Sequence, residues 1–175
     1  MAQKLVSYIE MSEFKKVLAA EKDRRYKLAY CLAMGSGLRI SEIIGYKSKK
    51  GEIPPLTKDR VDLEKHSIRI IQGKGKKDRI TVASKWLNKT NIELLPLKIP
   101  RRTLQGRFTN LCKKVLGKKL SFHKLRHGFG NYMSNEKKVP LPMVQQMMGH
   151  SRLSTTGIYT VSNPVNTIKT AWESF

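Results

Sequence analysis

The sequence predicts an α+β fold that is mostly α-helical and contains one small three-stranded antiparallel sheet. Over most of the chain apolar residues recur at helical spacing, and glycines or prolines punctuate these segments. Only residues 60–84 change to a period of two, with β-branched residues at alternating positions. A chain of 175 residues has the length of one domain, and no internal boundary or repeat is visible.

The N-terminal third is expected to hold two helices and a connector. A first helix is predicted to start at Ser12, because an apolar face follows it at helical spacing. Residues 24–39 (RRYKLAYCLAMGSGLR) predict a second helix that stops at Gly35 and Gly37. Residues 51–56 (GEIPPL) are predicted to form a turn-rich connector.

The sheet is expected within residues 60–84 (RVDLEKHSIRIIQGKGKKDRITVAS). Turns are predicted at residues 64–66 and 73–77, which leaves three short strands joined as consecutive hairpins. The second turn, at GKGKK, places lysines at a hairpin tip.

The C-terminal half is expected to be helical after a loop that contains Pro96 and Pro100. Each expected helix has a start or stop signal. The helices are residues 102–117 with Gly117 as the stop, 122–135 capped by Ser121, 143–148 opened by Pro142 and ended by Gly149, and 163–174 as the last helix.

Net charge is the most informative property of the composition. The chain has 35 Lys and Arg against 13 Asp and Glu, a formal net charge of +22. From Leu94 to Trp172 the only acid is Glu136, against fourteen basic residues. Such self-repulsion indicates a polyanionic partner, and nucleic acid is favoured over a merely well-solvated surface. The scarcity of carboxylates argues against a two-metal nuclease, which needs several acids around its ions.

The sequence also limits compartment and cofactors. Cys31 and Cys112 lie in apolar helical contexts and are expected to be core thiols in a reducing cytosol. No Cys/His spacing resembles a zinc site, no P-loop is present, and no apolar run approaches the roughly 20 residues needed to cross a bilayer. We expect a cytoplasmic protein without a membrane partner, a metal or another cofactor.

Four short segments concentrate chemically useful side chains. Alone, each has a plain structural explanation, such as a surface charge, a charged turn, a helix cap or a core tyrosine. His123 and His127 have the spacing of a zinc pair, but Lys124 replaces the metalloprotease glutamate and no third ligand is evident. The segments are GSGLRISE with Arg39, GKGKKDR with Lys74, HKLRH with His123, Arg126 and His127, and GHSRLSTTGIY with His150 and Tyr159.

Together, in this order and with these gaps, the segments resemble the tyrosine recombinases, the lambda-integrase family that includes the Xer proteins. That family has an arginine in GLR-x-sE, a lysine in a β-hairpin, H-x-x-R-H on a helix, and lGH…sTT…Y. The match covers Ser12 to Thr160. It implies the tyrosine recombinase catalytic-domain fold and a site-specific DNA recombinase or integrase from a virus or mobile element. Type IB topoisomerases share the chemistry and stay an alternative, as does a catalytically silent DNA-binding domain.

The resemblance assigns roles in a reaction that needs neither ATP nor metal. Guanidinium forks suit the equatorial oxygens of a phosphorane, and such donors are commonly worth about 3–4 kcal/mol each. A lysine whose pKa is depressed by neighbouring cations is able to protonate the leaving 5′-oxygen. The implied catalytic residues are Tyr159 as the nucleophile that forms a 3′-phosphotyrosine, Arg39 and Arg126 on the non-bridging oxygens, Lys74 as the acid, and His123 and His150 completing the site.

Further residues are expected to support this centre. Glu42 is predicted to orient Arg39 or a neighbouring base, and His127 to pack or hydrogen-bond structurally. The flexible segment SRLSTTG (residues 151–157) suggests that Tyr159 moves in and out of reach, in its own site or a neighbour's. Candidates for contacts with the DNA backbone are Lys76, Lys77, Arg79, Lys113, Lys114, Lys118 and Lys119.

The catalytic pattern begins close to Met1, so we expect residues 1–175 to be a single catalytic domain without the N-terminal core-binding domain of complete recombinases. The expected partner is double-stranded DNA, bound weakly and with strong salt dependence. The isolated domain is expected to be monomeric, whereas full-length protomers on DNA would form a synaptic tetramer.

Overall fold

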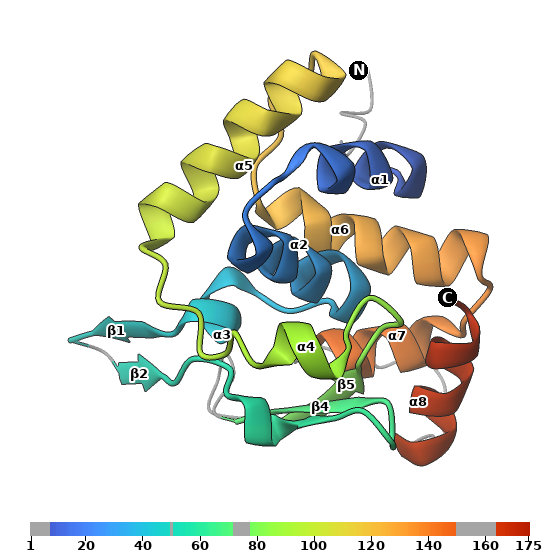
Figure 1. Ribbon diagram of the computed structural model, residues 1–175. Helices are drawn as coiled ribbons and strands as arrows, with labels where there is room; N and C mark the ends of the chain where they lie inside the picture. The colour runs from blue at the N-terminus through green and yellow to red at the C-terminus, as the bar shows by residue number, and fades with distance from the viewer. Residues whose placement is uncertain (1–7, 50, 72–77, 150–163) are drawn as a thin grey trace.

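The computed structural model describes residues 8–49, 51–71, 78–149 and 164–175 (Figure 1). It confirms the predicted class, with many helices and small antiparallel sheets. The elements are α1 (Met11–Ala20), α2 (Arg24–Ser36), α3 (Ile40–Ile44), β1 (Tyr46–Ser48), β2 (Gly51–Ile53), the 3-10 helix η1 (Lys58–Arg60), β3 (Val61–Asp62), β4 (Ser67–Ile70), β5 (Arg79–Val82), α4 (Lys89–Ile92), α5 (Arg101–Leu116), α6 (His123–Asn131), the π-helix η2 (Tyr132–Glu136), α7 (Leu141–Met148) and α8 (Pro164–Glu173).

The helices α1, α2, α5 and α6 pack against one another above the sheet in the view of Figure 1. Beneath them, α7 and α8 pack on β5. One apolar cluster lies among the upper helices and includes Phe14, Tyr30 and Phe108, whereas a second joins β5 to α6, α7 and α8. The helix α6 borders both clusters, so its position is fixed from two sides.

The predicted three-stranded sheet is confirmed, with order β3-β4-β5 and antiparallel pairing. The hairpin β4–β5 ends at the pair Ile70↔Arg79, so residues 71–78 connect the two strands there. The two-stranded sheet β1–β2 was not predicted. Its residues are almost all exposed and lack apolar alternation, so the predicted connector carried no strand signal.

Several predicted helix starts lie one or two residues from the observed ones. The helix α7 begins at Leu141, with Pro142 inside its first turn. The helix α1 begins at Met11 rather than at Ser12, because the Glu13 carboxylate accepts a hydrogen bond from the Glu10 N–H (3.2 Å) and moves the cap upstream. The helix α6 begins at His123, and the hydroxyl of Ser121 caps nothing; the Ser121 carbonyl accepts from Lys124 N instead.

The end of α2 shows why two glycines stand there. Gly37 ends the helix with φ +67, and a Cβ at this position would lie 2.6 Å from Cδ1 of Phe129 on α6. Gly35 is inside the helix rather than at its end, and a Cβ there would lie 2.3 Å from Ser84 Oγ. The glycines thus let the end of α2 approach α6 and the segment after β5 closely.

The two cysteines are buried thiols, and burial raises the pKa of each to about 12. No helix in the described parts of the chain combines the length and apolar character needed to cross a bilayer.

Candidate active site

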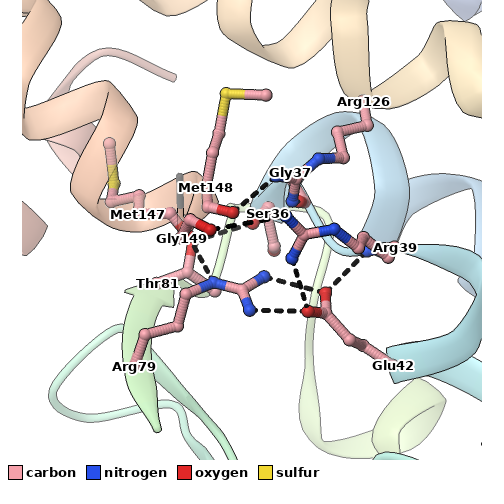
Figure 2. Close-up of polar contacts among 10 residues, drawn as sticks. All are labelled: Ser36, Gly37, Arg39, Glu42, Arg79, Thr81, Arg126, Met147, Met148 and Gly149. Carbon is pink, nitrogen blue, oxygen red and sulfur yellow. Dashed lines mark hydrogen bonds and ion pairs between the residues drawn. The ribbon is translucent and has the colours of Figure 1, made fainter. Parts of the chain in front are cut away.

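Three arginines, one just before α3, one on β5 and one on α6, converge on the C-terminal end of α7 (Figure 2). The last carbonyls of a helix lack intrahelical partners and carry partial negative charge, so cations there are stabilising. Each successive carbonyl accepts from a different guanidinium: Arg79 Nε donates to Met147 O over 2.8 Å, Arg126 Nη2 donates to Met148 O, and Arg39 Nη2 approaches Gly149 O at 3.4 Å.

Arg126 lies on α6 and is 3% exposed. Its Nη1 donates to Gly37 O, so the guanidinium joins the end of α2 to the end of α7. Burial, followed by repulsion from Arg39 and Arg79, lowers the pKa of Arg126 to about 9, which leaves it charged at neutral pH. Arginine has five N–H donors, and those beyond these two have no partner among the described residues.

Arg39 precedes α3 and is held by Glu42, one turn later. The Arg39 backbone N–H donates to Glu42 Oε2 (2.7 Å), and Nη1 donates to Oε1 (3.0 Å). The carboxylate therefore makes the contact with Arg39 that the RISE segment predicted. The Arg39 side chain keeps 19% of its surface exposed, more than the 8% of Arg79.

Arg79 does not stand where the sequence placed it. As a candidate phosphate contact it was expected on the surface beside Lys76 and Lys77, yet its side chain is only 8% exposed. Nη1 and Nη2 donate to the two oxygens of Glu42 at 2.6 and 2.8 Å. A buried carboxylate needs paired donors on both oxygens, and this need draws Arg79 inward.

The electrostatic balance of the cluster is positive. Burial alone would raise the pKa of Glu42, but hydrogen bonds and charge from Arg79 and Arg39 outweigh it, and the pKa is lowered. The carboxylate is therefore ionised at neutral pH. With Arg39, Arg79 and Arg126 charged, these four side chains carry a net charge of +2, which suits an oxyanion.

His123 opens α6 and His127 follows one turn later, with the ring centroids 4.6 Å apart and nearly perpendicular. Partial burial, His127 and the charges of Arg126 and Arg39 lower the pKa of His123, so the ring is neutral at pH 7 and close enough to sense both arginines. Burial, Lys124 and Arg126 lower the pKa of His127. In the part of the chain that the structure describes, no three His, Cys, Asp or Glu side chains are grouped to hold a metal.

Acidification from pH 7 to 5 is expected to reduce the free energy of unfolding through these two rings. Both titrate near 6.5 in the unfolded chain and at a lower pH in the fold, so the unfolded state binds protons first. Stability is then present above pH 6.5 and is lost as the pH falls through the folded values. Urea denaturation at several pH values measures this loss, and the variant His123→Asn/His127→Asn should show a flatter profile. An equal slope in wild type and variant would contradict the assignment.

Five predicted site residues lie outside the described part of the chain. So does the segment 151–157, which was predicted to let Tyr159 move in and out of reach. What the structure describes is their anchor points: Arg79 at the base of the hairpin, and Gly149 at the end of α7 with φ +65. A Cβ on Gly149 would lie 2.7 Å from Cδ of Arg79, so glycine lets the helix end rest on the arginine stem. The five residues are Lys74, Lys76, Lys77, His150 and Tyr159.

The basic run of residues 113–119 lies elsewhere. It includes the last turn of α5, which packs on α1 away from α7 and β5 in Figure 1. Lys118 forms an ion pair with Glu13. Lys113, Lys114 and Lys119 are exposed and form no ion pair with any other described residue.

Residues 7–165 match the phage integrase family. The tyrosine recombinase XerA of Pyrococcus horikoshii is 32% identical over 165 residues, which cover 85% of this chain and 54% of that protein. The tyrosine recombinase XerC of Escherichia coli is 32% identical over 145 residues, which cover 72% of this chain and 45% of that protein. The chain thus spans about half the length of the curated relatives it matches.

Solved structures agree on the fold. The integrase from mycobacterium phage Brujita superposes with a TM-score of 0.71 at 21% identity, covering 100% of this chain and 60% of that one. The XerA recombinase gives 0.62 at 24% identity, covering 93% and 62%, and the catalytic domain of bacteriophage HP1 integrase gives 0.56 at 20% identity, covering 83% and 82%. The predicted resemblance is confirmed: the chain belongs to the phage integrase family.

Proposed function

We propose that this chain is the catalytic domain of a site-specific DNA recombinase or integrase. It would cut and rejoin DNA strands through a 3′-phosphotyrosyl intermediate, without metal or ATP. One observation carries the proposal: Arg39 and Arg126, far apart in the sequence, lie on consecutive carbonyls at the end of α7, and Arg126 has N–H donors that no other described residue accepts. Two guanidiniums held in this way are placed to share one phosphate.

The chemistry follows from that geometry and from the family pattern. The Tyr159 phenolate, after loss of its proton to water, attacks phosphorus, the bond from phosphorus to the 5′-oxygen breaks, and Lys74 gives the leaving oxygen its proton. Arg39 and Arg126 stabilise the charge on the non-bridging oxygens, with His123 and His150 beside them. Attack by the 5′-hydroxyl reverses each step, so the phosphotyrosine conserves the bond energy for ligation.

Double-stranded DNA is the proposed partner. The charge of +22 supports it. XerH has been solved bound to a difH substrate, and lambda integrase as a dimer bound to a core site, both with the same fold. We propose that the isolated domain is monomeric and that complete protomers assemble as a tetramer on two DNA sites, in the cytoplasm of a prokaryotic or infected host cell.

A nicked suicide substrate tests the proposal. The short fragment beyond the scissile phosphate diffuses away after cleavage, so religation fails and the protein stays linked to the DNA. We expect the purified chain to form this adduct in EDTA and without nucleotide. Absence of the adduct on every candidate site would leave a silent DNA-binding domain. Relaxation of supercoils without exchange between two sites by the complete protein would indicate a topoisomerase instead.

A further inference from the structure

The Glu42 carboxylate is fully shared between two arginines (Figure 2). Oε1 accepts from Arg39 Nη1 (3.0 Å) and from Arg79 Nη1 (2.6 Å), while Oε2 accepts from the Arg39 backbone N–H (2.7 Å) and from Arg79 Nη2 (2.8 Å). Arg79 makes the shorter, two-pronged contact through its side chain. Arg39 gives only one side-chain N–H to this carboxylate and one long contact from Nη2 to Gly149 O, which leaves its other N–H groups for another ligand.

The way in which Arg39 and Arg79 share the Glu42 carboxylate determines how much uncompensated positive charge faces a bound phosphate. A phosphodiester carries one negative charge, and attack by a phenolate brings a second. If Arg79 neutralises Glu42, Arg39 and Arg126 supply two uncompensated charges to match the two. Without Arg79, the buried Glu42 would take both prongs of Arg39, and the charge left for the phosphate would fall to +1.

Arg79 also fixes the elements around the site. It is the first residue of β5, at the base of the hairpin that leads into residues 71–78, and its Nε holds Met147 O at 2.8 Å. The end of α7 rests directly on its stem at Gly149. One side chain thereby connects the hairpin, the carboxylate of α3 and the helix end that receives Arg39 and Arg126.

We infer that Arg79 is a positioning residue of the reaction, which acts through Glu42 and the end of α7 to leave the charge of Arg39 uncompensated and its guanidinium turned toward the phosphate. The inference rests on the proposed function. It differs from the phosphate contact expected for Arg79, because it requires no contact between Arg79 and DNA.

A second pair in the same chain offers a matched control. Arg107 on α5 holds Glu21 in the same manner, with Nε and Nη2 at 2.9 and 2.6 Å from its two oxygens, and Glu21 is 2% exposed. No other arginine shares that carboxylate among the described residues. Arg107→Met therefore removes a two-pronged ion pair to a buried carboxylate away from the arginine cluster, although the Arg107 side chain is more exposed (44%) than that of Arg79 (8%).

The test is single-turnover cleavage of the nicked suicide substrate by folded variants, with thermal denaturation and DNA affinity measured alongside. Arg79→Met is expected to slow cleavage by about 100-fold, the usual effect of a small misplacement at a reacting centre. Arg79→Lys keeps the positive charge but lacks the planar guanidinium fork, so its cleavage rate should lie between those of wild type and Arg79→Met. Arg79→Met/Glu42→Gln removes both charges, frees Arg39 again, and should recover at least about 10-fold of the loss. Arg107→Met should stay within about threefold of wild type.

Cleavage rates are read against melting temperatures, because neutralising Glu42 in Arg79→Met also removes an unpaired buried carboxylate and so repairs the fold. Recovery of cleavage that exceeds any recovery of the melting temperature distinguishes positioning from structural support. The inference is overturned if Arg79→Met cleaves within threefold of wild type, if the double variant is no faster than Arg79→Met, or if Arg107→Met loses as much activity. Failure of the wild-type protein to cleave would instead overturn the proposed function, and this role with it.

Discussion

Replacement of Arg126 by alanine is expected to slow strand cleavage by about 10²–10³-fold. The guanidinium is buried, spans the ends of α2 and α7, and keeps N–H donors that none of the described residues uses. Preorganised donors gain most in a water-poor site, because they need no reorganisation when charge develops on the non-bridging oxygens. Single-turnover cleavage under saturating DNA measures the loss without interference from product release.

A chemical control separates this role from structural support. A methylphosphonate at the scissile position removes the charge of one non-bridging oxygen. The ratio of its cleavage rate to that of the native phosphate should therefore be higher for Arg126→Ala than for wild type. Arg126→Lys, which keeps the charge but loses the planar fork, should remain well below wild type. Cleavage of the native substrate by Arg126→Ala within threefold of wild type would contradict the assignment.

Replacement of Glu42 by alanine is expected to cause the largest loss of stability, about 3–5 kcal/mol in the free energy of unfolding. Glu42 is 2% exposed and is the carboxylate among three arginine side chains of the cluster. Its removal leaves Arg79 and Arg126 buried with no counter-charge and in mutual repulsion. Urea denaturation measures the change directly.

Glu52→Ala is the control for that prediction. Glu52 faces Lys47 at 3.9 Å with 63% of its side chain exposed, so its ion pair is screened by water and its loss should change stability little. If Glu42→Ala were as mild as Glu52→Ala, the carboxylate would not be the counter-charge of the cluster.

Much of the fold could be predicted because local signals and packing agree. The strand period in residues 60–84 gave the three-stranded sheet, and Gly117 and Gly149 mark helix ends through their positive φ. The failures are local. The hairpin β1–β2 is exposed on both faces, so its sequence lacks the alternation of apolar and polar residues that marks a strand. The start of α1 was set by the hydrogen bond between Glu13 and Glu10 rather than by Ser12.

The site could be predicted where a motif carries it, and less where it depends on three-dimensional pairing. GLRISE and HKLRH marked Arg39 and Arg126, and the structure brings the two together at the end of α7. Arg79 looked like one more cation of a basic hairpin. Its role in the cluster depends on a buried carboxylate 37 positions earlier, and a linear pattern contains no sign of that partner. Net charge likewise could not show that Lys118 is paired with Glu13.

Covalent trapping of wild type and Tyr159→Phe on one suicide substrate tests the central claim most directly, that the arginine cluster serves a tyrosine nucleophile. We expect wild type to accumulate an adduct whose DNA-linked peptide contains Tyr159, while Tyr159→Phe binds the same DNA with similar affinity and forms none. An adduct that persists in Tyr159→Phe, or that maps to another residue, would contradict the account.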